Sequence, residues 1–85
     1  MEAALIGAGN MGANHARVLL NRTDTHMLHV CDPNSSRLQA LPCDPRLRGY
    51  LDIDSLLANS SRLEFAVVAV PTEYHYQVAR RLLEC

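Results

Sequence analysis

The stretch "ALIGAGNMGANHARVL", residues 4–19, decides the fold of this 85-residue chain. A short apolar run leads into three glycines, Gly7, Gly9 and Gly12, and a segment with helical periodicity follows. The spacing matches G-x-G-x-x-G, a pattern that is specific only where it follows a strand and opens a helix. In that context the first glycine permits a tight turn, the second lets a pyrophosphate approach the backbone, and the third allows close helix–strand packing.

The residues inside the motif belong to the same expected site. A helix that begins at Asn10 offers unpaired N–H groups and the positive end of its dipole to a phosphate group. We therefore expect Asn10 and Met11 to bind a dinucleotide together with the three glycines. The alternative is an ordinary glycine-rich turn with no ligand.

Asp32 follows a second apolar run, residues 27–31, and lies twenty residues after Gly12. An acidic residue at this place accepts hydrogen bonds from the adenosine ribose of a dinucleotide. Its negative charge would repel a 2′-phosphate, which favours NAD over NADP. Arg37 is close enough in sequence to leave the use of NADP open. The alternative is an aspartate that only caps the next helix.

Strands and helices are expected to alternate along the whole chain. Apolar runs predict strands over residues 3–6, 27–31, around Tyr50 and over 64–70, and helical patterns predict helices over 10–21, after Asp32, over 54–58 and over 73–84. Such alternation is typical of right-handed crossovers between parallel strands. We expect an α/β fold, a partial doubly wound (Rossmann) sheet of about four strands.

Local signals set the expected ends of two short helices. Pro33 suits the first position of the second helix, and Asn34 and Ser35 are capping types. Asp54 or Ser55 is expected to cap the third helix.

The four histidines do not suggest a metal site. No two of them have a metal-ligand spacing such as i, i+4, and no metal is expected. His26 and His29 are expected at a solvent-facing or partly buried edge of the second strand.

Composition excludes several classes of protein. The net charge of −1 argues against nucleic-acid binding, and no apolar run is long enough to span a membrane. We see no signal peptide. The three cysteines are odd in number and widely spaced, which fits a reducing compartment; they are Cys31, Cys43 and Cys85. We expect a cytoplasmic protein.

Four stretches together resemble the N-terminal region of the Gfo/Idh/MocA oxidoreductases: "IGAGNMGANHARVL", "VCDPNSSRL", "LDIDSLLANSSRLEFAVVAVP" and "PTEYHYQVARRLLEC". The resemblance implies hydride transfer between a nicotinamide cofactor and a sugar, polyol or related substrate. It also implies that Pro71, Thr72 and His75 lie beside the nicotinamide half of the cofactor. Thr72 as a helix cap and His75 as a structural hydrogen-bonding residue are the alternatives. For His15, packing at the helix–sheet seam is the favoured interpretation.

The chain departs from the family in its catalytic part. In the family a Glu-Lys-Pro stretch with a catalytic lysine follows the fourth helix, and a substrate domain follows later. This chain contains no lysine and stops at Cys85. We expect residues 1–85 to be a truncated dinucleotide-binding domain without catalytic residues or a substrate domain, inactive by itself. The alternatives are a non-catalytic dinucleotide-binding or partner-binding module, and a product too incomplete to fold stably.

The segment "FAVVAV", residues 65–70, is expected to form the fourth strand. In a sheet of order 3-2-1-4-5-6 this strand is internal. Without a fifth strand it becomes a flat, apolar, uncharged edge, which favours pairing with another chain. We therefore expect self-association through Phe65–Val70.

Overall fold

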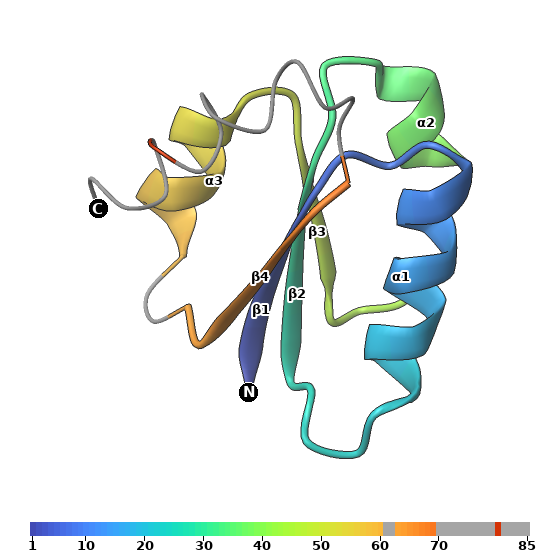
Figure 1. Cartoon of the computed structure of the whole chain (residues 1–85), viewed down its shortest axis with the longest axis vertical. Helices are drawn as coiled ribbons and strands as arrows, with labels where there is room; N and C mark the ends of the chain where they lie inside the picture. Colours follow the sequence, from blue (N-terminus) through green and yellow to red (C-terminus); the bar gives the residue numbers. More distant parts are fainter. Residues whose placement is uncertain (61–62, 70–79, 81–85) are drawn as a thin grey trace.

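The computed structural model describes residues 1–60, 63–69 and 80 (Figure 1). Strands and helices alternate along the chain, as expected. The elements are β1 (Glu2–Ile6), α1 (Asn10–Asn21), β2 (Met27–Cys31), α2 (Ser35–Gln39), β3 (Leu47–Tyr50), α3 (Ile53–Asn59) and β4 (Phe65–Val68). Apart from residue 80, the helix expected over residues 73–84 lies outside the described residues.

All four strands are parallel and lie in the order β3-β2-β1-β4. The register brings Ile6, at the end of β1, opposite both Cys31 of β2 and Val68 of β4. The carboxyl ends of the three strands therefore meet at one edge of the sheet. The order confirms a partial doubly wound α/β fold.

Helices cover both faces of the sheet, α1 and α2 on one side and α3 on the other (Figure 1). Side chains of a strand alternate between the faces, so β1 contributes to two cores. Leu5 is buried in the cluster beneath α1, whereas Ala4 and Ile6 pack in a second cluster with Leu56 of α3. Burial of β1 on both sides explains its continuous apolar sequence.

The helical periodicity of α1 matches its burial. Ala16, Leu19 and Leu20 are buried against the sheet, whereas Arg17 and Asn21 are exposed. The apolar stripe at three- and four-residue spacing therefore orients the helix on the sheet.

The start of α2 differs from the expectation by two residues. Pro33 lies before the helix rather than in its first turn, because the N–H of Asn34 donates to Asp32 Oδ1 at 2.8 Å. This bond holds Asn34 in extended geometry as the N-cap. Its own Oδ1 then accepts from the N–H of Ser36 at 3.0 Å.

The cap of α3 is Asp52, so the expectation of Asp54 or Ser55 is wrong. Asp52 Oδ1 accepts from the N–H of Ser55 at 2.7 Å, and Oδ2 accepts from its hydroxyl at 3.0 Å. These bonds lower the pKa of Asp52. An aspartate three residues before a backbone donor is the typical N-cap arrangement.

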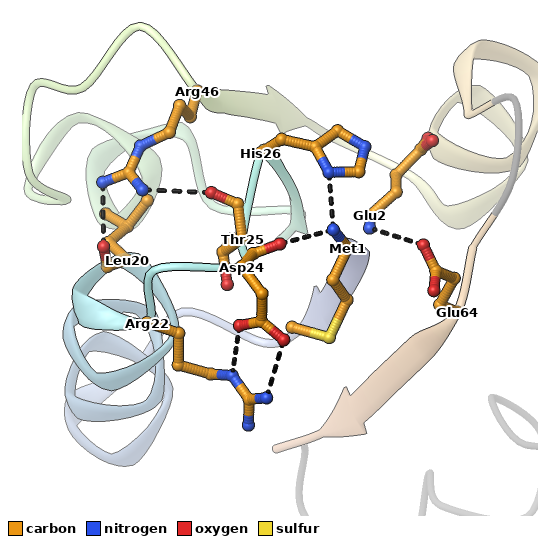
Figure 2. A network of polar contacts seen from close by, with 9 residues as sticks. All are labelled: Met1, Glu2, Leu20, Arg22, Asp24, Thr25, His26, Arg46 and Glu64. Atoms are coloured by element: carbon orange, nitrogen blue, oxygen red, sulfur yellow. Dashed lines mark hydrogen bonds and ion pairs between the residues drawn. The ribbon is translucent and has the colours of Figure 1, made fainter.

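Arg46 joins three segments at the amino end of the sheet (Figure 2). Its guanidinium donates to the carbonyl of Leu20 at 2.8 Å, in the last turn of α1, and to the carbonyl of Thr25 at 3.1 Å. It also pairs with Asp44 at 2.9 Å. A cation suits this place because the carbonyls at a helix C-terminus lack intrahelical partners.

The first residues of the chain meet the same turn (Figure 2). The amino group of Met1 contacts the carbonyl of Asp24 and His26 Nδ1. Arg22 pairs with the Asp24 carboxylate at 2.9 Å. His26 is exposed, as expected for the start of β2.

Candidate functional site

The loop after β1 turns at Gly7. Its φ of 103° lies in the left-handed region, where a side chain would be strained. The N–H of Gly7 donates to the carbonyl of Cys31 at 2.7 Å. This bond attaches the loop to the carboxyl end of β2.

Position 12 requires a glycine because the backbone of Gly7 lies too close for a side chain. A Cβ added there would lie 2.1 Å from the carbonyl oxygen of Gly7, a separation that no real contact reaches. The first turn of α1 therefore rests directly on the backbone at the end of β1.

Gly9 differs from the other two glycines because nothing in the described residues requires a glycine there. Its φ of −71° suits any residue, and an added Cβ would meet only Arg37 Nη1, at 4.0 Å. Gly9 is also the N-cap of α1, and no side chain caps the helix at that position. The glycine therefore leaves open space beside backbone N–H groups at the positive end of a helix, a place suited to an anion.

Asp32 lies directly beside this loop and is almost fully buried, at 2% exposure. Its Oδ2 accepts from the N–H of Ala8 at 2.8 Å, and its Oδ1 accepts from the N–H of Asn34. The carboxylate thus holds the glycine loop against the turn after β2. An ionised carboxylate has about four acceptor positions, so two of them stay available for further donors.

Arg37 reaches the same carboxylate from α2. Its Nη1 lies 3.7 Å from Asp32 Oδ2, and its side chain is 57% exposed. A long, exposed arginine side chain moves at little energetic cost. The guanidinium therefore borders the open space at Gly9 without closing it permanently.

Cys31 precedes the aspartate but does not supply a nucleophile. Burial, and to a smaller extent the charges of Asp52 and Asp32, raises the pKa of its thiol to about 11. A thiol with this pKa is protonated at neutral pH and unreactive. Cys31 is therefore not a candidate nucleophile at this edge of the sheet.

The structure brings some of the expected site residues together. The three glycines and Asp32 surround the loop at the carboxyl ends of β1 and β2, and Asn10 and Met11 are the first residues of α1. His15, further along α1, is half-buried.

The nicotinamide-side residues expected from the resemblance are Pro71, Thr72 and His75. They lie outside the described residues.

A buried polar chain across the sheet was not anticipated. His29 is 3% exposed, so its expected place at a partly exposed edge is wrong. Its Nε2 lies 2.7 Å from Glu2 Oε1 and its Nδ1 lies 3.0 Å from the hydroxyl of Tyr50. β2 lies between β1 and β3, so Glu2 on one side and Tyr50 on the other flank the His29 side chain. In the sequence, the only sign of this pair is that Glu2 and His29 are polar residues within otherwise apolar strands.

Within residues 1–60, 63–69 and 80, no three histidine, cysteine or acidic side chains are grouped to hold a metal ion. In the same described part, no helix has both the length and the apolar character that crossing a bilayer needs.

The fold and the glycine loop define a dinucleotide-binding Rossmann domain, and comparison with known families agrees. The family model for "Oxidoreductase family, NAD-binding Rossmann fold" matches residues 1–85. The chain therefore belongs to the Gfo/Idh/MocA oxidoreductases, as its NAD-binding Rossmann portion.

Two curated relatives are inositol 2-dehydrogenases from two strains of Corynebacterium glutamicum. They are 29% and 28% identical to this chain over 86 aligned residues, which cover 99% of the chain. The chain spans only about 25% of the length of these relatives. No solved structure gives a significant match.

Proposed function

We propose that this chain provides the pyrophosphate- and adenosine-binding part of a dehydrogenase that acts on a polyol or related sugar. The similarity to inositol 2-dehydrogenases supports this substrate class. The bound nicotinamide cofactor supplies the hydride acceptor or donor. The residues of this chain hold and orient that cofactor.

The observation that carries the proposal is the open space at Gly9. Gly7 and Gly12 are explained by backbone conformation and internal contact, but Gly9 is not. A ligand that must come within contact distance of the backbone explains the missing side chain. We assign the pyrophosphate to this place, where first-turn N–H groups of α1, from Asn10 and Met11 onward, would donate to it.

We propose that Asp32 accepts hydrogen bonds from the adenosine ribose and that NAD is preferred over NADP. Two of its acceptor positions are taken by backbone N–H groups that fix its orientation. The remaining positions suit the two ribose hydroxyls once Arg37 moves aside. A 2′-phosphate would bring a second negative charge to a buried carboxylate, which is costly even with Arg37 nearby.

Thermal unfolding with each cofactor tests this assignment. A ligand that binds only the native state at a hundredfold excess over its Kd stabilises it by about 2.7 kcal/mol. NAD should raise Tm more than NADP at equal concentration, and Asp32→Asn should narrow the difference. Equal shifts with both cofactors in the unmodified chain would contradict the NAD preference.

We propose that Pro71, Thr72 and His75 face the nicotinamide half of the cofactor, as the family resemblance implies. We also propose a cytoplasmic location, which the scattered cysteines support. The substrate itself would be bound by parts of the longer protein, because this chain spans about 25% of its curated relatives.

A further inference from the structure

A hollow of about 660 Å³ lies over β2 and β3, away from the glycine loop. Its polar lining comes from His29, Arg48, Tyr50 and Asn59. His29 pairs in register with Arg48, and Tyr50 follows two residues later, so the three side chains share the α3 face of the sheet. A volume of this size suits a small organic molecule.

Arg48 is the charged group of this hollow. Within the described part of the chain, it alone among the arginines has neither a side-chain hydrogen bond nor an ion pair. Arg48 is exposed. Burial raises the pKa of the Tyr50 phenol, and the positive charge of Arg48 lowers it by a smaller amount. A guanidinium without an acidic partner is a ready contact for an oxyanion.

Further hydrogen-bond donors lie around the hollow. Asn59 uses one amide hydrogen for the carbonyl of Ser55 at 2.8 Å, which leaves its second hydrogen for a ligand. The carbonyl of Tyr50 accepts from the N–H of Asp32, so even-numbered residues of β3 bond to β2. The N–H of Gly49 consequently points away from β2, toward the edge of the sheet.

Within the described part of the chain, no acidic side chain lines the hollow. Glu2 lies behind His29, and its carboxylate contacts the imidazole Nε2 at 2.7 Å. The other imidazole nitrogen, Nδ1, lies 3.0 Å from the hydroxyl of Tyr50, and the Glu2 charge contributes to raising the pKa of this phenol. An anion in the hollow would therefore meet the donors of Arg48 and Asn59 directly, and the Glu2 carboxylate only across His29.

We propose that this hollow binds a small organic anion through a carboxylate or phosphate group, with Arg48 as its charged contact. The site is separate from the dinucleotide loop, and its occupation does not depend on cofactor binding.

Amide and side-chain NMR of the 85-residue chain tests the proposal. Sodium phosphate and sodium malonate are titrated separately, and sodium chloride keeps the ionic strength constant. Saturable shifts at residues 47–50, at Asn59 and at the His29 imidazole are expected with at least one probe. The probe that binds distinguishes a phosphate ligand from a carboxylate ligand.

Three variants separate this site from others. Arg48→Gln should weaken binding at least about tenfold, as expected for the loss of a charge-assisted hydrogen bond. Arg17→Gln, on the exposed face of α1, and Gly9→Val, in the dinucleotide loop, should leave the shifts at residues 47–50 unchanged. Binding by Arg48→Gln equal to that of the unmodified chain, or no shifts at residues 47–50 with either probe, would overturn the proposal.

Discussion

Three glycines in one short motif have three different physical reasons. Gly7 adopts a φ of 103°, and Gly12 touches the carbonyl of Gly7, so both serve the chain's own fold. Gly9 has an ordinary φ, and among the described residues only Arg37 comes within 4.0 Å of a Cβ added there. Substitutions at these positions should therefore separate folding from ligand binding.

Gly9→Val should fold and lose NAD binding, because its branched side chain would fill the space assigned to the pyrophosphate. Gly12→Ala should instead lower Tm even without cofactor, because its Cβ would collide with the Gly7 backbone. Circular dichroism melts with and without NAD measure both effects. Normal NAD binding by Gly9→Val would show that the phosphates bind elsewhere.

Asp32 has a structural role besides the proposed contact with ribose. In Asp32→Ala, the buried N–H of Ala8 and the part-buried N–H of Asn34 would lose their acceptor. Such a loss costs about 1–3 kcal/mol for each buried group left without a partner. Urea unfolding should therefore show reduced stability in the absence of any cofactor. Arg37→Ala is the matched control and should change stability little, because its side chain is largely exposed.

Cys31 and Cys43 provide a chemical probe of the fold. Cys31 is buried and its pKa is raised to about 11, whereas Cys43 is exposed. Iodoacetamide at pH 8 should modify Cys43 and spare Cys31 in the folded chain, and should modify both in urea. Mass spectrometry of tryptic peptides measures the two sites. Equal rates in the native chain would contradict the burial of β2.

At the scale of elements, the segments that connect helices and strands also hold neighbouring elements together. The segment between α2 and β3 carries Arg46, which joins the last turn of α1 to the turn before β2. The side-chain hydrogen bond from Arg46 holds the pKa of Asp44 at about 2, below its usual value. A carboxyl whose pKa is depressed by folding contributes stability above its unfolded pKa and loses that contribution as pH falls toward 2.

Asp44→Asn should therefore lower Tm at pH 7 but have a smaller effect at pH 2. Arg46→Gln should lower Tm more at pH 7, because Arg46 also donates to the carbonyls of Leu20 and Thr25. Arg22→Gln, which removes only an exposed pair with Asp24, is the control. Melting curves between pH 2 and pH 7 measure these differences. A pH-independent effect of Asp44→Asn would contradict the lowered pKa.

At the scale of the whole molecule, β4 lies at one side of the described sheet. It pairs with β1, and no strand in residues 1–60 or 63–69 pairs with its other side. Phe65 at its start is 48% exposed. An apolar strand with free backbone groups favours pairing with another chain. Self-association through Phe65–Val70 thus stays our proposal for the isolated chain.

The 85-residue chain should sediment as dimers or larger species, and Ala66→Lys should shift it toward monomer. Ala66 is exposed, so a charge there should oppose strand pairing without entering a core. Analytical ultracentrifugation measures the distribution, and Arg17→Lys, remote from β4, is the control. A monomeric unmodified chain whose β4 amides exchange as slowly as those of β1 would refute the proposal.

The isolated chain should not reduce NAD with inositol or any other polyol, because it contains no lysine to match the family's catalytic position. Absorbance of the reduced cofactor at high chain concentration measures the activity. Catalysis by the purified chain would show that its own residues are sufficient for hydride transfer.

Much of the fold was predictable from local patterns. Continuous apolar runs predicted β1 and β2, three- and four-residue spacing predicted the buried face of α1, and the glycine motif located the loop between them. These signals are local, because burial and backbone conformation act on residues close together in the chain. The same motif predicted the three glycines and Asp32 as site residues, and the structure brings them together around one loop.

Only the tertiary structure decided the rest. Sequence spacing did not reveal that Asp32 holds the N–H of Ala8, that Arg46 caps α1, or that His29 lies buried between Glu2 and Tyr50. Each contact joins residues more than twenty positions apart. Such contacts exist only after parallel pairing sets the register of the strands, because register determines which side chains share a face of the sheet.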